Sequence, residues 1–322
     1  MISAQGSRVV TPVVTLAMVT FLVAAAAAVQ KERELRYPPP APADDILYIT
    51  SGPVVRRLAV GYNALVADLY WIRAIQYYGG TKLRLSNPGA ATSGEGVPGF
   101  TNEAAPYSML YPMLDLTTTL DPRFNIAYRF GAIFLAEALP GGAGRPDLAI
   151  DLLEKGLRAR PDRWEYMQDI GFVHYWWRHD YKAASDWFTR ASDVPGAPWW
   201  LKSLAANTLT EGGDRRSSRL MWESIRESAE IDWLRNDAER RLTQLRALDE
   251  IDVLQAAVDR AVAAGVTPLD WPSIVRTGVL PGIPVDPSGS LYEIGADGRV
   301  RLSTKSSLYP LPAEPHPLQS AP

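Results

Sequence analysis

The chain has 322 residues, of which 47% are hydrophobic, so it can bury one large core or two smaller ones. Lys and Arg number 33 against 36 Asp and Glu, a net charge of −3, which argues against a general nucleic-acid-binding protein because such proteins carry a basic surface. The lack of cysteine excludes disulfide bonds, thiolate metal sites and haem attachment through C-x-x-C-H.

An uncharged segment near the amino terminus is the clearest physical feature of the chain. After a tail at 1–8, the stretch Val9–Val29 runs for 21 residues without a charged side chain. A helix of ~20 apolar residues is long enough to cross the hydrocarbon core of a bilayer. We therefore predict a transmembrane signal anchor at 9–30, followed by a proline-rich stalk at 31–46.

A cleaved signal peptide is the alternative interpretation, with Ala26 and Ala28 in the A-x-A positions. The apolar stretch, however, exceeds the ~7–15 residues of a usual signal-peptide core.

The orientation of the segment in the membrane is also open to two interpretations. Lys and Arg are more numerous after the segment than before it, which favours a cytoplasmic body, whereas the short amino-terminal tail and the ease with which long domains translocate favour an exported one. We expect the exported orientation.

Residues 47–250 are predicted to form a helical domain. Residues 53–78 have a long helical pattern that a glycine pair closes. The segment 81–106 is polar, glycine-rich and without periodicity, so we expect a long loop, and loops of this length are often functional. From Tyr107 to about Leu248 the pattern indicates successive amphipathic helices.

The prolines and small residues of these helices recur at a fixed interval, which is typical of repeat proteins. Ala149 and Ala183 lie 34 residues apart, and so do Pro161 and Pro195. A large apolar residue follows each alanine four positions later, and an earlier unit keeps the same spacing with Leu110, Leu114 and Pro122. The preceding helices carry a matching signal in Phe130-Gly131 with Phe134, and in Ile170-Gly171 with His174.

Together these positions resemble the tetratricopeptide repeat (TPR) family, whose pattern is W-x2-L-G-x2-Y…A-x3-F…P over 34 residues. The resemblance covers about 107–229. It implies an all-α fold, a TPR-like right-handed superhelix of antiparallel helix pairs in which small residues let two helices approach closely. The chain departs from the pattern by a six-residue insertion between Gly131 and Ala149 and by Leu204-Ala205 in place of an L-G pair.

The carboxy-terminal part has a different composition. We expect capping helices at 251–279 and a hairpin extension at 280–309, because Ser290–Thr304 alternates between apolar and polar residues around Asp297-Gly298. The tail at 310–322 is rich in proline and is predicted to be disordered.

The sequence offers few candidates for catalysis or metal binding. Its three histidines are His174, His179 and His316, and none lies in an H-E-x-x-H motif. Asp286 and Asp297 are spaced like the ends of a calcium loop, but a leucine occupies the position that requires glycine. Neither a G-x-S-x-G elbow nor a Walker A loop is present. We therefore assign no catalytic, cofactor-binding or metal-binding residue and expect a protein that is not an enzyme.

The stretch "GFVHYWWRHDYKAA" at 171–184 is the strongest candidate for a binding site. At 100° per residue, one helical face carries the packing positions of the repeat, including Gly171 and His174. Gln168, Phe172, Tyr175, Trp176 and His179 fall on another face, which in the TPR family lines the concave groove. The resemblance therefore implies a protein-binding groove formed by these five residues.

Two charged residues interrupt the helical pattern at 53–78. Asp68 and Arg73 lie in an otherwise apolar helix, where a carboxylate is costly unless it is paired. Either they form a structural pair, or Asp68 bonds to a nearby backbone group or tyrosine. A functional alternative is that Asp68 is a proton carrier or an anchor for a basic residue of a partner.

We expect a membrane-anchored scaffold of the bacterial cell envelope that binds protein partners, without cofactor or nucleic acid. The segment "VADLYWIRAIQYYGG" at 66–80 is similar to one in exported bacterial repeat proteins, which implies a single-pass inner-membrane protein with a periplasmic or other extracytoplasmic body. Two alternatives stay open. One is an enzyme or enzyme subunit acting on cell-wall or lipid precursors, with the long loop as a lid. The other is a structural accessory subunit of a secretion, pilus or other membrane complex.

Overall fold

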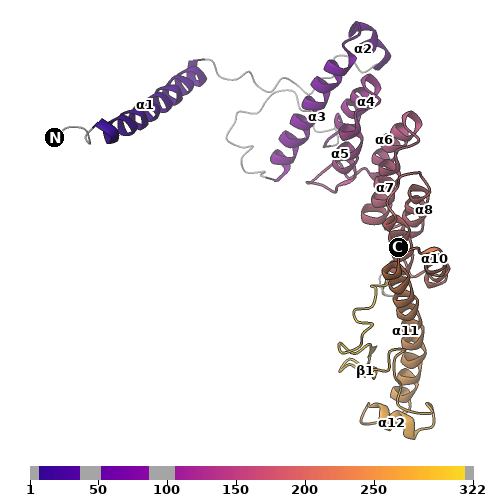
Figure 1. Cartoon of the computed structure of the whole chain (residues 1–322). Helices are drawn as coiled ribbons and strands as arrows, with labels where there is room; N and C mark the ends of the chain where they lie inside the picture. Colours follow the sequence, from indigo (N-terminus) through magenta and orange to yellow (C-terminus); the bar gives the residue numbers. More distant parts are fainter. Residues whose placement is uncertain (1–6, 37–51, 87–105, 316–322) are drawn as a thin grey trace. The chain divides into compact units, whose positions relative to one another are not determined.

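The computed structural model describes residues 7–36, 52–86 and 106–315. This part of the chain is mostly helical, with one small hairpin and irregular segments near the carboxy terminus, which is consistent with the predicted all-α class (Figure 1). The chain divides into two units. One contains helix α1, and the other contains all the remaining helices and the hairpin.

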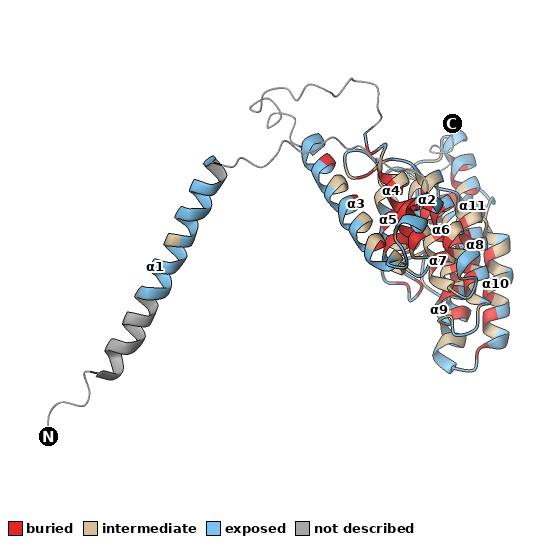
Figure 2. Cartoon of the chain, turned by 90° about the horizontal axis from the view of Figure 1, so that it is seen from above, coloured by how far each residue is buried: buried red, intermediate tan, exposed pale blue. Residues whose placement is uncertain are grey.

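Helix α1 (Ser7–Arg36) is continuous and includes the first residues of the predicted stalk. Its described side chains, which begin at Met18, are almost all exposed, as the blue colour in Figure 2 shows. Within the described residues, no helix combines the length and apolar character needed to cross a membrane. The anchor at 9–30 therefore stays a prediction. The stalk at 31–46 is corrected at its start, because the helix continues to Arg36, and the rest of it lies outside the described residues.

The helix predicted at 53–78 is two helices, α2 (Gly52–Leu58) and α3 (Asn63–Ser86), separated by a turn. Helix α3 also passes through Gly79 and Gly80, which were expected to end it. Each exposed helical glycine costs ~1 kcal/mol relative to alanine, but tertiary contacts hold the flanking residues. The Tyr78 ring stacks on Phe134 with centroids 4.0 Å apart, and its hydroxyl donates to a backbone carbonyl 2.7 Å away. The loop predicted at 81–106 therefore begins after Ser86, and 87–105 lie outside the described residues.

Seven α-helices and one π-helical turn follow in zigzag order, each α-helix packed on the next. They are α4 (Leu110–Leu120), α5 (Asn125–Ala136), α6 (Pro146–Ala159), α7 (Trp164–Val173) with η2 (His174–Arg178), α8 (Tyr181–Ser192), α9 (Trp200–Glu211) and α10 (Arg215–Ser228). Two aspartates cap helices in this series. Asp180 accepts a hydrogen bond from the Ala183 amide at the start of α8, and Asp214 accepts one from the Ser217 amide at the start of α10.

Glycines occupy the points of closest helix approach. A Cβ atom on Gly131 of α5 would lie 2.9 Å from Leu114 Cδ2 and 3.1 Å from Leu152 Cδ2. On Gly171 of α7 it would lie 2.4 Å from Cε1 of Phe188, whose side chain is fully buried in α8. Real Cβ atoms essentially never lie within 3.0 Å of another heavy atom, so any larger residue at these positions would force its neighbours to shift.

Helix α11 (Asp232–Ala263) is one long helix, so the predicted boundary at 250/251 falls inside it. After α12 (Trp271–Arg276), strands β1 (Glu293–Ile294) and β2 (Val300–Arg301) form the predicted hairpin, with Ile294 opposite Val300. The hairpin is held on α11, because the Val300 amide donates to Gln255 Oε1 at 2.8 Å. Behind it, the Trp271 indole N–H donates to the Tyr292 carbonyl at 2.7 Å.

The first residues of the tail predicted as disordered are ordered. Arg215 of α10 donates to both carboxylate oxygens of Glu314 at 2.6 Å and also pairs with Asp249 and Asp252 of α11. Leu311 packs against two hydrophobic clusters, one that contains Trp271 and one that contains Trp222. A charge-assisted bidentate pair is among the stronger polar contacts, and here it fixes a proline-rich segment that has no secondary structure of its own. The residues after 315 lie outside the described part.

Arg215→Ala is therefore expected to lower the free energy of unfolding by about 1–3 kcal/mol, because the half-buried Glu314 loses its cationic partner. Arg145→Ala is the matched control. Arg145 binds Asp147 with the same bidentate geometry but is exposed, so its removal should leave stability nearly unchanged. Urea denaturation of the three chains measures both effects, and limited proteolysis should cut the Arg215 variant near 310–315. Equal free energies of unfolding for the wild-type chain and Arg215→Ala would contradict a structural role for the tail.

Candidate functional site

A π-helical turn shapes the aromatic stretch at 171–184. Helix α7 ends at Val173, η2 continues to Arg178, and His179 follows in the left-handed region with φ 50°. A π-helical turn accommodates one more residue than an α-helical turn, so side chains after it are rotated relative to the 100° rule. The face expected from a regular α-helix is therefore not the face that forms.

The five predicted groove residues do not share one open surface. Trp176 is 60% exposed and His179 is exposed, whereas Gln168 is half-buried. Phe172 packs on Phe188 with ring centroids 5.1 Å apart, and Tyr175 donates its hydroxyl to Glu211 of α9. Burial, together with this carboxylate, raises the pKa of Tyr175. Phe172 and Tyr175 are thus mainly packing residues, and Trp176 is the large aromatic side chain of the set that is open to a ligand.

A broader apolar surface lies on helices α3 and α5, and it was not found from the sequence. The ring of Phe134 of α5 stacks on the rings of Tyr78 and Trp71 of α3, with centroids 4.0 and 6.3 Å apart, so aromatic side chains of the two helices meet. The exposed sides next to this seam carry large apolar residues at helical spacing, each between 41% and 58% exposed. This α3–α5 face consists of Leu65, Leu69, Ile72 and Ile75 on α3 and Ile126, Phe130 and Ile133 on α5.

The sequence does contain a weak signal for this face. Helix α5 reads "NIAYRFGAIFLA" and is apolar on all sides, a pattern typical of a fully buried helix. Neighbouring helices cover its Ala127, Gly131 and Leu135 side but leave Phe130 and Ile133 exposed. An all-apolar helix near the end of a helical stack therefore indicates an uncovered side, but which side is uncovered depends on the neighbours.

Asp68 and Arg73 do not form the predicted structural pair. Both side chains are exposed on α3, and no hydrogen bond or ion pair involves either of them within the described ranges. Asp68 is exposed on the same side of α3 as Leu65, Leu69 and Ile72, so its carboxylate needs no partner inside the protein. Its alternative role as a partner contact stays a prediction.

The ion pair that does link helices here joins Arg129 of α5 to Asp169 of α7, with Nε and Oδ2 2.5 Å apart. Burial raises the pKa of Asp169, and the guanidinium opposes that shift. The pair fixes α5 against α7 at the border of the exposed apolar surface. It therefore links the helix that carries Phe130 to the helix that leads into η2 and Trp176.

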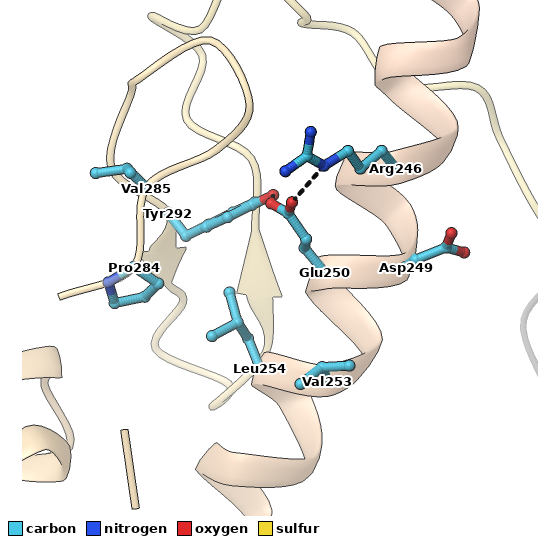
Figure 3. A pocket seen from close by; sticks show the side chains of 8 residues that line it. All are labelled: Arg246, Asp249, Glu250, Val253, Leu254, Pro284, Val285 and Tyr292. Atoms are coloured by element: carbon cyan, nitrogen blue, oxygen red, sulfur yellow. Dashed lines mark hydrogen bonds and ion pairs between the residues drawn. The ribbon is translucent and has the colours of Figure 1, made fainter. Parts of the chain in front are cut away.

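A pocket of about 450 Å³ lies between α11 and residues 284–292 (Figure 3). Val253, Leu254, Pro284 and Val285 form its apolar walls. At its polar end the Tyr292 hydroxyl donates to Glu250 Oε2 at 2.9 Å, and the Arg246 Nε donates to Glu250 Oε1 at 3.1 Å.

The polar groups of this pocket are bound to one another. Burial, strengthened by the bond to Glu250, raises the pKa of Tyr292, so its hydroxyl stays protonated at neutral pH. Asp249 binds Arg215 and Arg219. Glu250 is committed to Tyr292 and Arg246, so the arrangement is that of a packing seam, without a nucleophile held against a base.

Asp286 organises the turn before the hairpin. Its carboxylate accepts hydrogen bonds from the backbone amides of Ser288 and Ser290 and from the hydroxyls of Ser288 and Ser306. Burial alone would raise its pKa, but these donors lower the pKa below its usual range. A carboxylate surrounded by N–H and O–H donors stabilises a turn, and this is the role that Asp286 has here.

Comparisons of the chain with protein-family models, with curated proteins and with solved structures found no match.

Proposed function

We propose that the chain is a membrane-anchored, TPR-like scaffold that binds a protein partner through the α3–α5 face and Trp176. The observation that carries the proposal is the row of seven large apolar side chains on neighbouring helices, all at least 41% exposed. Contiguous apolar patches are uncommon on soluble proteins without a binding role. Aromatic residues in such patches supply most of the binding free energy at protein interfaces.

The TPR-like part of the proposal is supported by spacing and packing together. The 34-residue interval between Ala149 and Ala183 recurs in helices α6 and α8, which both pack against α7. Gly131 and Gly171, which match the glycine of the repeat pattern, both stand where a Cβ atom would meet a neighbouring side chain. These contacts are the physical reason for a small residue in that pattern.

The anchor is supported by the composition and exposure of α1. Its side chains from Met18 to Val29 are apolar apart from one threonine and are exposed almost throughout. A helix that is apolar on all sides is stable in a bilayer, where no polar face is required. We place α1 in the bacterial inner membrane and the helical body outside the cytoplasm.

The full-length chain is expected to stay with membranes through an alkaline carbonate wash. Replacing Leu22 and Val23 with arginine should release it, because each charge at the centre of a membrane helix costs ~2.5–3.5 kcal/mol. Leu220→Arg with Val262→Arg is the control, since both residues are exposed but lie outside α1. Release of the wild-type chain would contradict the anchor, and activity of only a cytoplasmic reporter fused after Ala313 would reverse the orientation.

Partner binding is tested by recovering proteins from detergent-solubilised membranes with the tagged full-length chain and with variants of the α3–α5 face. A partner that is recovered equally well by wild type and variants would contradict binding through this face.

A further inference from the structure

The turn between α2 and α3 exposes large apolar side chains outside the α3–α5 face. Val60 is 80% exposed and Tyr62 is 70% exposed, and Leu58 and Val54 beside them are exposed as well. We call residues 54–62 the α2–α3 tip. Four large apolar side chains within nine residues therefore face solvent.

Hydrogen bonds hold this turn in shape. The Ala59 amide donates to the Val55 carbonyl at 2.9 Å, and the Tyr62 amide donates to the Ala59 carbonyl at 2.8 Å. Between them Val60 has φ 45° and Gly61 has φ 92°. A β-branched residue is unfavourable in the left-handed region, and burial of the valine side chain does not compensate for it. The turn thus holds an apolar side chain outward at a conformational cost, a feature that is common at functional sites.

The charge around the tip is basic although the chain as a whole is acidic. Residues 54–62 contain two basic side chains and no acidic one, against a net charge of −3 for the chain. Arg56 and Arg57 are exposed on α2, within the tip itself. Exposed apolar residues next to basic ones suit the surface of an anionic bilayer, where the apolar groups enter the headgroup region and the cations bind lipid phosphates.

We propose that the α2–α3 tip binds the surface of an anionic lipid bilayer. Val60 and Tyr62 enter the interface, where tyrosine is favoured, and Arg56 and Arg57 contact the phosphates. This inference rests on the proposed function, because α1 brings the tip to the membrane. Only 15 residues separate Arg36 from Gly52, and a chain of that length spans at most ~50 Å.

The absence of cysteine makes a direct test possible in the full-length chain. A polarity-sensitive fluorophore is attached to a single cysteine in Val60→Cys, and the chain is reconstituted into vesicles that carry a quencher on the lipid acyl chains. One set of vesicles contains phosphatidylcholine and phosphatidylglycerol, and the other contains phosphatidylcholine alone. Val253→Cys is the matched control, an exposed valine on α11, and Phe21→Cys reports on α1.

The label at Val60 is expected to shift to the blue and to be quenched in the mixed vesicles, with clearly less quenching in phosphatidylcholine alone, while the label at Val253 is quenched in neither. Charge reversal in Arg56→Glu with Arg57→Glu should reduce quenching at Val60 to the level in phosphatidylcholine.

A label at Val60 that stays unquenched in mixed vesicles, while a label at Phe21 is quenched, would overturn the inference. The exposed tip would then be a candidate contact for a protein partner. Equal quenching of the label at Val60 in both kinds of vesicle would overturn the preference for anionic lipid. An unquenched label at Phe21 would instead refute the membrane anchor, so failure of the tip proposal and failure of the proposed anchor are distinguishable.

Discussion

Gly171→Ala is expected to lower the free energy of unfolding by about 1–3 kcal/mol, and Gly171→Leu by more, because the added atoms collide with a buried ring. An added Cβ atom would lie 2.4 Å from Cε1 and 2.6 Å from Cδ1 of Phe188. Phe188 is fully buried among Ala184, Leu201 and their neighbours, so its ring has no free volume into which to move. Thermal and urea denaturation measure the loss.

Gly79→Ala is the matched control for this experiment. Gly79 is also a helical glycine, but a Cβ atom there would have no neighbour within 4 Å. Alanine should therefore stabilise α3 by roughly 0.5–1 kcal/mol, because it reduces the freedom of the unfolded chain. Opposite signs for the two substitutions would establish Gly171 as a close contact. An unchanged melting temperature in Gly171→Leu would show that α7 and α8 do not meet there.

Phe130→Ala should weaken partner binding by about 2–4 kcal/mol, which is roughly a 30- to 1000-fold loss of affinity. Trp176→Ala should act in the same direction if the partner extends from the α3–α5 face to the end of α7. Neither change should greatly affect folding, because half or more of each side chain is exposed. Affinity for the recovered partner and the melting temperature are measured on the same samples.

Trp233→Ala serves as the control for aromatic loss in general. Trp233 is a large exposed aromatic residue on α11, several helices further along the chain than α3 and α5. Its replacement by alanine should leave partner binding unchanged. Lost binding in Phe130→Ala with a normal melting temperature would support the α3–α5 face. A fall in stability that accompanies the loss of binding would instead place Phe130 in the core, and the proposed face would then be wrong.

Several elements of the fold follow from local chemistry and could be predicted from the sequence. Proline and aspartate at helix ends, with apolar residues at helical spacing between them, predict α6, α8 and α10. Apolar and polar residues alternate on either side of Asp297-Gly298, and this pattern predicts the hairpin. The turn of a β-hairpin needs a residue that tolerates positive φ, and Gly298 has φ 76°. The match of Ile170-Gly171 and His174 to the repeat pattern identifies Gly171 as a packing position before any contact is known.

The candidate surface depended on tertiary structure. Periodicity marks which side chains are apolar, but neighbouring helices decide which of them are covered, so Phe172 is packed and Phe130 is exposed. The π-helical turn after Val173 also rotates the predicted face, and no single residue in that stretch encodes it.

Tertiary contacts also set the end of helix α3 and the extent of the ordered tail. Contacts of Tyr78 with Phe134 and with the Gly141 carbonyl carry α3 beyond a glycine pair that would end an isolated helix. Arg215 orders a proline-rich tail through Glu314, which lies 99 residues further along the chain. The sequence by itself determined where helices form, because backbone propensity and apolar spacing are local. Only the tertiary structure decided where helices end and which faces stay open, because these depend on contacts between residues far apart in the chain.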